Sequence, residues 1–211
     1  PEVFRIIEIS KANKEVFQYV LQFLGNKFAT SNVMGFDAIF VAIAEKYYLT
    51  GQAWWVDKKT LDNIQKKVND LKPNLIGKQC PSLELPDMMG VIRKLSEIKA
   101  KITVLYFYDS NCSHCKKVTP EIKKLYDVFK PKGLEIYAVY TQGNQPEIVE
   151  YINKNSLNWI NVWDPAQNSK FRDLFDIYST PVIYVLDKNK KIIAKRISEE
   201  SLKQMLELEL K

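Results

Sequence analysis

Two cysteines in close spacing are the residues of this chain best suited to chemistry. Cys112 and Cys115 stand in the segment Cys112-Ser113-His114-Cys115, where an apolar run ends and a helical pattern begins. Thiols in this spacing lie one helical turn apart and can close a small disulfide ring. At a helix N-terminus, the unpaired N–H groups and the positive end of the helix dipole favour the thiolate form of the first cysteine. The pattern predicts a redox dithiol in which Cys112 is the nucleophile and Cys115 resolves the mixed disulfide.

The single histidine of the chain, His114, lies between these two cysteines. A protonated or N–H-donating imidazole there is expected to stabilise the Cys112 thiolate. Because this stabilisation exists only in the reduced form, it raises the reduction potential, with 30 mV equal to about 1.4 kcal/mol. The histidine therefore favours oxidising behaviour.

The third cysteine, Cys80, stands in Gly77-Lys-Gln-Cys-Pro81 and is interpreted as a small, partly buried thiol, with a resolving role as the alternative. A structural zinc site would need about four Cys or His ligands. His114 sits between the two cysteines on the same turn and does not easily join them around one ion. We therefore expect neither a metal nor another bound cofactor, only a redox-active disulfide between Cys112 and Cys115.

The dithiol needs a strand before it and a helix after it, and both are present in the pattern. The β-branched and aromatic run 102–108 predicts a buried central strand, and 112–130 predicts the helix that carries the thiols. Further strands are predicted at 134–140, 159–163, 182–186 and 191–197, with a hairpin at 82–85 and 91–94. Further helices are predicted at 146–155, 169–175 and 199–210, the last with Ser198 as its cap. Strands alternating with helices indicate a mixed sheet covered by helices on both faces.

The chain before this region has a different pattern. Residues 1–72 show only helical periodicity, and Asp57 is a plausible N-cap of the last helix. The segment 72–77 contains a proline and a glycine and separates this part from the strands. We therefore predict a helical domain over 1–72 and an α/β domain over 76–211.

Composition excludes several classes of protein. The chain has 211 residues, of which 46% are hydrophobic, and a net charge of +6 from lysines spread over many segments. This excludes a disordered chain, and the lack of a basic cluster interleaved with aromatics argues against nucleic-acid binding. No apolar run approaches the roughly 20 residues that span a bilayer. The chain begins with Pro1 rather than Met, so we expect a processed or truncated product from which a signal sequence or lipid anchor was removed.

In its order of elements and its motifs, the region 76–211 resembles the thioredoxin-like superfamily, and its first segment, 76–87, looks like that of TlpA-like envelope thiol-disulfide oxidoreductases. Cys112-Ser113-His114-Cys115 matches the redox motif, Pro120 the helix-kinking proline, and Pro181 the cis-proline that faces the disulfide. The strand and helix over about 134–158 match an insertion typical of this branch. The helical region before them is similar to N-terminal extensions of some anchored envelope relatives.

This resemblance implies an α/β fold, a thioredoxin-like mixed sheet flanked by helices and preceded by a small all-α domain. It implies catalysis by Cys112 and Cys115 with support from Ser113, His114, Thr180 and Pro181. If Pro181 is cis, the backbone at Thr180 is expected to pair with an extended substrate segment beside the sulfurs. The implied partners are protein thiols or disulfides and an upstream redox partner, and the implied location is the periplasm of a bacterial cell envelope.

Two positions depart from thioredoxin itself. Tyr106 stands where thioredoxin has a buried acidic residue, and Asn111 stands where it has a tryptophan. Deprotonation of Cys115 would then use water, a neighbour such as Asp109, or the substrate. The direction of electron flow stays open, because a histidine at this motif position is typical of disulfide-forming relatives whereas TlpA-like proteins usually act as reductants.

The alternatives to thiol-disulfide exchange are a thiol peroxidase and a non-enzymatic binding module. A thiol peroxidase would need a threonine and an arginine near the thiolate, and the helix that carries the motif does not supply such a set. A non-enzymatic module would use a thioredoxin-like scaffold only to bind a partner, and the presence of both cysteines and the facing proline argues against it.

Overall fold

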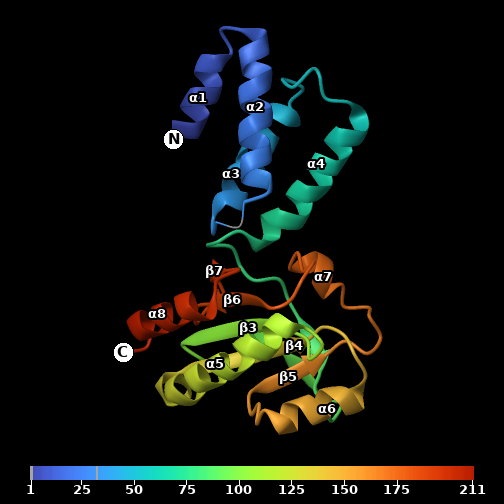
Figure 1. Cartoon of the computed structure of the whole chain (residues 1–211), viewed down its shortest axis with the longest axis vertical. Helices are drawn as coiled ribbons and strands as arrows, with labels where there is room; N and C mark the ends of the chain where they lie inside the picture. The colour runs from blue at the N-terminus through green and yellow to red at the C-terminus, as the bar shows by residue number, and fades with distance from the viewer. Residues whose placement is uncertain (1, 32) are drawn as a thin grey trace. The chain divides into compact units, whose positions relative to one another are not determined.

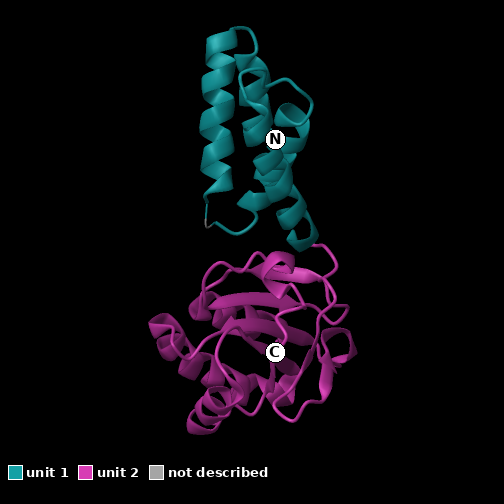
Figure 2. Cartoon of the chain, turned by 90° about the vertical axis from the view of Figure 1, so that its right-hand side faces the viewer, with its two compact units in different colours: residues 1–75 teal, residues 76–211 magenta. Residues whose placement is uncertain are grey.

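The computed structural model describes residues 2–31 and 33–211, so Pro1, on which the expectation of processing rests, lies outside the described residues. The chain folds into two compact units, residues 1–75 and residues 76–211, coloured separately in Figure 2. Each has a hydrophobic core of its own. None of the helices in the described part of the chain is long and apolar enough to cross a membrane.

The first unit is helical. Its elements are α1 (Glu2–Ser10), α2 (Lys14–Ala29), α3 (Phe36–Ile43) with a π-helical continuation (Ala44–Tyr48), α4 (Lys58–Leu71) and a 3₁₀ turn (Lys72–Asn74). The predicted cap of the last long helix is present, because the Asp57 side chain accepts a hydrogen bond of 2.8 Å from the backbone N–H of Thr60. Buried side chains from all four helices form one core, including Ile7, Leu21, Phe40 and Val68.

The second unit contains a five-stranded mixed sheet in the order β5-β4-β3-β6-β7. Its strands are β3 (Ile102–Tyr108), β4 (Leu134–Tyr140), β5 (Ile160–Trp163), β6 (Val182–Leu186) and β7 (Ile192–Lys195). The central strand β3 is parallel to β4 and antiparallel to β6, and β4 is parallel to β5. A separate antiparallel hairpin is formed by β1 (Glu84–Pro86) and β2 (Ile92–Lys94).

Helices flank this sheet, as the sequence predicts. The helices α5 (Ser113–Phe129), α6 (Gln145–Lys154) and α8 (Glu199–Glu209) contribute to the core on one face, and α5 lies across the strands in Figure 1. The other face is covered by the short helix α7 (Phe171–Leu174) and by the segment that contains the β1–β2 hairpin. Leucines of that segment, such as Leu83 and Leu85, are buried in the core on this face.

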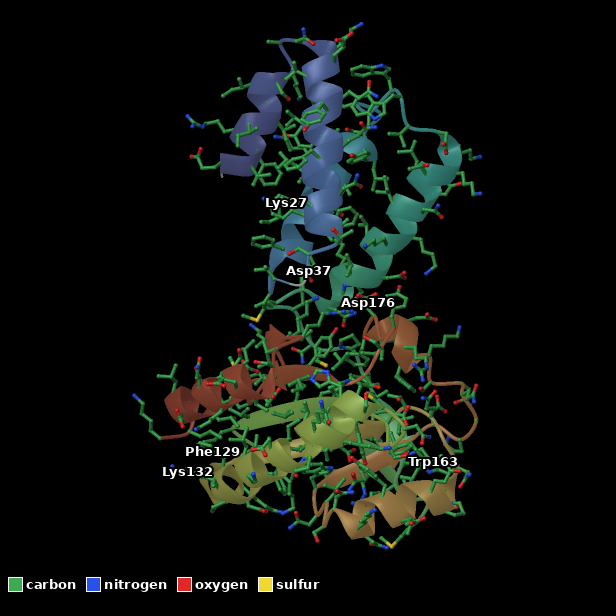
Figure 3. The ribbon with its side chains drawn as sticks, in the orientation of Figure 1. Lys27, Asp37, Phe129, Lys132, Trp163 and Asp176 are labelled. Atoms are coloured by element: carbon green, nitrogen blue, oxygen red, sulfur yellow. The ribbon has the colours of Figure 1, made fainter. Side chains whose placement is uncertain are left out.

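The alternation of side chains along β3 determines what lies beneath α5. All seven residues of the strand are buried. Val104, Tyr106 and Tyr108 share a core with α5, whereas Leu105 and Phe107 belong to the core on the other face, as a strand period of two requires. The first turn of α5 therefore lies above tyrosine side chains. Phe129, labelled in Figure 3, is the last residue of this helix, and Lys132, also labelled, ends the 3₁₀ turn that follows.

Candidate active site

Cys112 is the N-cap residue of α5. Its backbone is extended (φ −78°, ψ 118°), and its Sγ accepts a hydrogen bond of 3.2 Å from the backbone N–H of Cys115. The turn before it is held by Asp109, whose Oδ1 accepts from Asn111 N at 2.8 Å and whose carbonyl accepts from Cys112 N at 3.3 Å. The sulfur thus occupies the place where a capping oxygen normally satisfies a free helix N–H.

The second part of the site comes from far along the chain. The antiparallel pairing of β3 with β6 places Phe107 opposite Val182, so the start of β6 lies beside the end of β3. The Thr180–Pro181 peptide bond directly before β6 is cis. The Cys112 thiol donates to the carbonyl oxygen of Thr180 at 3.2 Å. The structure therefore brings together the motif and the Thr-Pro step that the resemblance paired with it.

The two thiols of the motif differ in acidity. Burial alone would raise the pKa of Cys112, but hydrogen bonds from Cys115 and from the backbone N–H of His114 outweigh burial and lower it. Burial, followed by the hydrogen bond with Cys112, raises the pKa of Cys115 to about 12. Cys112 is partly exposed, whereas Cys115 is completely buried. The arrangement provides one accessible, acidic thiol and one protected, weakly acidic thiol.

His114 contacts the motif through its backbone. Its imidazole is exposed at the first turn of α5 and forms no hydrogen bond with another described residue. Its contribution to the Cys112 thiolate comes from its backbone N–H. The structure thus shows a backbone contact of His114 with Cys112 and no hydrogen bond from the exposed imidazole to the thiol. Ser113, also exposed, occupies the first helical position and supplies no side-chain hydrogen bond to the thiols.

Sequence reasoning missed the side chains that hold the loop before Cys112. Asp109 is buried, and its second carboxylate oxygen accepts a hydrogen bond from Gln142 Nε2. Tyr140, at the end of β4, accepts from the backbone N–H of Ser110 at 3.1 Å and donates to the Ser110 hydroxyl. The sequence contains one signal for these supports. Tyr140 ends β4 and Gln142 follows it, and the carboxyl ends of the parallel strands β3 and β4 lie at the same edge of the sheet.

A buried hydroxyl pair below Cys115 was also missed. Thr119 lies four residues after Cys115 on the same face of α5, and its Oγ1 lies 2.9 Å from the hydroxyl of Tyr106 on β3. Both residues are fully buried. Tyr106, noted in the sequence only as a replacement for an acidic residue, thus places a neutral polar group beneath the dithiol.

Cys80 lies away from the dithiol. It belongs to the core on the opposite face of the sheet, where it is buried, whereas Cys115 belongs to the core under α5. Burial raises the pKa of Cys80 to about 12, although nearby Lys190 opposes this rise. A resolving role for Cys80 is therefore wrong for this structure, because the sheet separates the two thiols.

In the ranges 2–31 and 33–211, no three Cys, His, Asp or Glu side chains are grouped so that they could hold a metal ion. The only sulfur ligands at the motif are the two thiols already described.

Comparison with known proteins places this geometry in a family. The sequence profile of the AhpC/TSA family matches residues 76–195, more than half of the chain. The chain belongs to the AhpC/TSA family. A relative named thiol-disulfide oxidoreductase ResA, from Bacillus thuringiensis (strain Al Hakam), is 29% identical over 130 residues, which are 62% of this chain and 74% of that protein.

Solved structures similar to this chain have related descriptions. A domain of a possible thiol-disulfide isomerase from Cytophaga hutchinsonii is 40% identical, with a TM-score of 0.60, over 64% of this chain and 92% of that one. A thioredoxin-like protein from Bacteroides caccae, 17% identical with a TM-score of 0.80, shares the fold over 98% of this chain and 75% of its own. The chain is thus a member of the AhpC/TSA family with a thioredoxin-like fold, and it is similar to proteins named thiol-disulfide oxidoreductases.

Proposed function

We propose that this protein exchanges disulfides with protein partners through Cys112 and Cys115. The observation that carries the proposal is the contrast between the two thiols. Cys112 accepts a hydrogen bond at a helix N-terminus and has a lowered pKa, whereas Cys115 is fully buried and its pKa is raised to about 12. This contrast supports a division of roles into attacking and resolving thiol.

In the proposed reductive direction, the Cys112 thiolate attacks a partner disulfide and one partner sulfur leaves as a thiolate. The mixed disulfide between Cys112 and the partner is then attacked by Cys115, which forms the Cys112–Cys115 disulfide and releases the second partner thiol. The oxidative direction is the reverse. The carbonyl of Thr180, 3.2 Å from Cys112 Sγ, is the proposed contact point for an extended substrate segment beside the sulfurs.

Two substitutions test the proposal. Cys112→Ser is expected to abolish insulin reduction and dithiol oxidation, because the attacking sulfur is gone. Cys115→Ser is expected to accumulate mixed disulfides, visible on non-reducing gels and by mass spectrometry. Full activity of Cys112→Ser would contradict the proposed mechanism. If the unsubstituted protein shows neither activity, a module that only binds partners is favoured.

The reduction potential determines the direction of the proposed reaction. Hydrogen bonds to the Cys112 thiolate exist only in the reduced form, so they raise the potential. A value near about −270 mV would identify a reductant and one near about −120 mV an oxidant. Equilibration with glutathione mixtures, followed by alkylation of free thiols, measures it.

The proposed partners are proteins with accessible disulfides or thiols, together with an upstream protein that resets the dithiol. The proposed compartment is the bacterial cell envelope, because protein disulfides persist in oxidising compartments and not in the cytosol. Fractionation of the producing organism tests the compartment, and trapping with Cys115→Ser in the same cells identifies the partners.

A thiol peroxidase is less well supported. Such an enzyme needs an arginine beside the attacking thiolate, and each arginine of this chain is bonded elsewhere: Arg5 to Glu2, Arg93 to Asp87, Arg172 to the carbonyl of Thr141 and Arg196 to Asp176. The rate of peroxide consumption by the reduced protein tests this alternative.

A further inference from the structure

The buried side of Cys115 contains hydroxyl groups from three different elements. Tyr106 of β3 and Thr119 of α5 are hydrogen-bonded at 2.9 Å, and Tyr151 of α6 also interacts with the Thr119 hydroxyl. Tyr106 and Thr119 are fully buried, whereas Tyr151 is half-buried. Both tyrosines lie within electrostatic range of Cys115. We call these three residues the hydroxyl cluster.

The cluster is held in place by packing. The ring of Tyr106 stacks on Tyr108 with centroids 5.1 Å apart and meets Trp159 edge-on at 6.3 Å. Thr119, one helical turn below Cys115, has its hydroxyl fixed between the tyrosines. The neighbouring Tyr108 is not part of this arrangement, because its hydroxyl donates to Asn161 Oδ1 at 2.8 Å.

Cys115 must lose a proton before it can resolve the mixed disulfide. Burial raises the pKa of this thiol far above neutral pH, so very little of it is thiolate at pH 7. A group that removes the proton as the sulfur attacks would avoid this rare species. The sequence left water, Asp109 or the substrate as candidates for this step.

The groups around Cys115 narrow these candidates. Its polar neighbours are Cys112, the backbone N–H of Asp109, the side chain of Thr180 and the aromatic hydroxyls of β3 and α6. Asp109 presents its backbone N–H to the thiol, and its two carboxylate oxygens accept hydrogen bonds from Asn111 N and Gln142 Nε2. The Thr180 side chain lowers the pKa of Cys115 and so acts as a donor to the sulfur. In the core that Cys115 shares with Tyr106, the hydroxyls left to accept a proton are those of the hydroxyl cluster.

We propose that the hydroxyl cluster is the route by which the Cys115 proton leaves during resolution, with Thr119 as the residue that positions the two tyrosine hydroxyls. The proposal rests on the proposed function. As the Cys115 sulfur bonds to Cys112, the bond from Cys112 to the partner breaks and the partner sulfur leaves with the electron pair. The Cys115 proton passes to the cluster, and an equivalent proton leaves to water at half-buried Tyr151. No external oxidant is needed.

The test uses Ellman's reagent with the reduced full chain carrying Cys80→Ala. Attack by Cys112 releases the first coloured thiol, and resolution by Cys115 releases the second, so stopped-flow absorbance separates the two steps. Thr119→Val, which keeps the side-chain shape and removes the hydroxyl, is expected to slow the second phase at pH 7 about tenfold or more and to leave the first unchanged. The difference in second-phase rate between Thr119→Val and the chain that retains Thr119 should become smaller as the pH rises, because hydroxide then takes the proton directly.

Matched variants keep the result interpretable. Tyr106→Phe is expected to slow the second phase like Thr119→Val, and Thr119→Ser to restore it. Tyr108→Phe removes a buried hydroxyl from the same strand face outside the cluster and is expected to leave both phases unchanged. An unchanged second phase in Thr119→Val, or a slow second phase in Asp109→Asn alone, overturns the inference. Absence of a first phase in the unsubstituted protein would instead contradict the proposed function.

Discussion

Asn161 offers a strong test of how the sheet under α5 is held together. This buried side chain accepts at Oδ1 from the Tyr108 hydroxyl and from Trp159 Nε1, each at 2.8 Å. Its Nδ2 donates to the carbonyls of Leu157 and Trp159 at 2.8 and 3.0 Å. The amide group of Asn161 thus accepts two hydrogen bonds and donates two. Its partners Tyr108 and Trp159 belong to the core that also contains Cys115.

Asn161→Leu keeps a similar volume but leaves the two donors, Tyr108 and Trp159, buried without an acceptor. Each unsatisfied group costs about 1–3 kcal/mol, and the added apolar surface returns about 1–2 kcal/mol. We therefore expect the free energy of unfolding of the second unit to fall by about 2–4 kcal/mol. Asn158→Leu, at an exposed position of the same segment, is the matched control and is expected to change it by less than about 0.5 kcal/mol.

The buried thiol of Cys80 provides an assay specific to the second unit. It reacts with an alkylating agent only when that unit unfolds, so pulse alkylation along a urea gradient, in a chain that carries Cys112→Ser and Cys115→Ser, reports its stability. Asn161→Asp retains the acceptor for Tyr108 but places a charge against two carbonyls. The loss of unfolding free energy caused by Asn161→Asp should therefore be smaller at pH 4 than at pH 7. A loss below about 0.5 kcal/mol for Asn161→Leu would refute the account of this core.

Three further predictions concern the thiols and the hairpin. His114→Ala retains the backbone N–H and is expected to leave the pKa of Cys112 nearly unchanged, whereas His114→Pro removes the N–H and is expected to raise it, as followed by the ultraviolet absorbance of the thiolate; equal shifts would contradict this. Cys80→Ala is expected to keep insulin reduction within about twofold, and a tenfold loss would argue for a redox role. Hydrogen bonds from Arg93 and two backbone N–H groups outweigh burial and lower the pKa of Asp87, so its stabilisation is present above the unfolded-state pKa and is lost as the pH falls through the folded-state pKa. Asp87→Asn should cost about 1 kcal/mol at pH 7 and flatten the acid dependence of urea unfolding.

The periodic parts of the fold were predictable from the sequence, and their ends were not. The strand 102–108 and the helix that begins at the motif appear where the apolar pattern places them. The helix predicted over 169–175 is only Phe171–Leu174, because the Asp164 carboxylate holds Ser169 in the preceding loop through a hydrogen bond of 3.0 Å. The last strand ends at Lys195 and not at 197, because Arg196 has a positive φ of 54°.

The candidate site shows the same division. The motif and the Thr180–Pro181 step were recognisable because their residue types and order are distinctive. The supports from Thr119, Tyr140 and Gln142 were not recognisable, because they depend on which side chains of neighbouring elements meet after the sheet has formed. A buried tyrosine such as Tyr106 requires a partner for its hydroxyl, but periodicity does not say which residue provides it.

We expect Cys112 to be the acidic, attacking thiol and Cys115 to be a buried thiol that reacts only with the mixed disulfide. The most direct test treats the fully reduced protein with less than one equivalent of iodoacetamide at neutral pH and locates the label by mass spectrometry of peptides. The account predicts label on Cys112, with Cys115 and Cys80 unmodified, because both are buried and their pKa values are raised to about 12. Preferential labelling of Cys115 or Cys80 would contradict it.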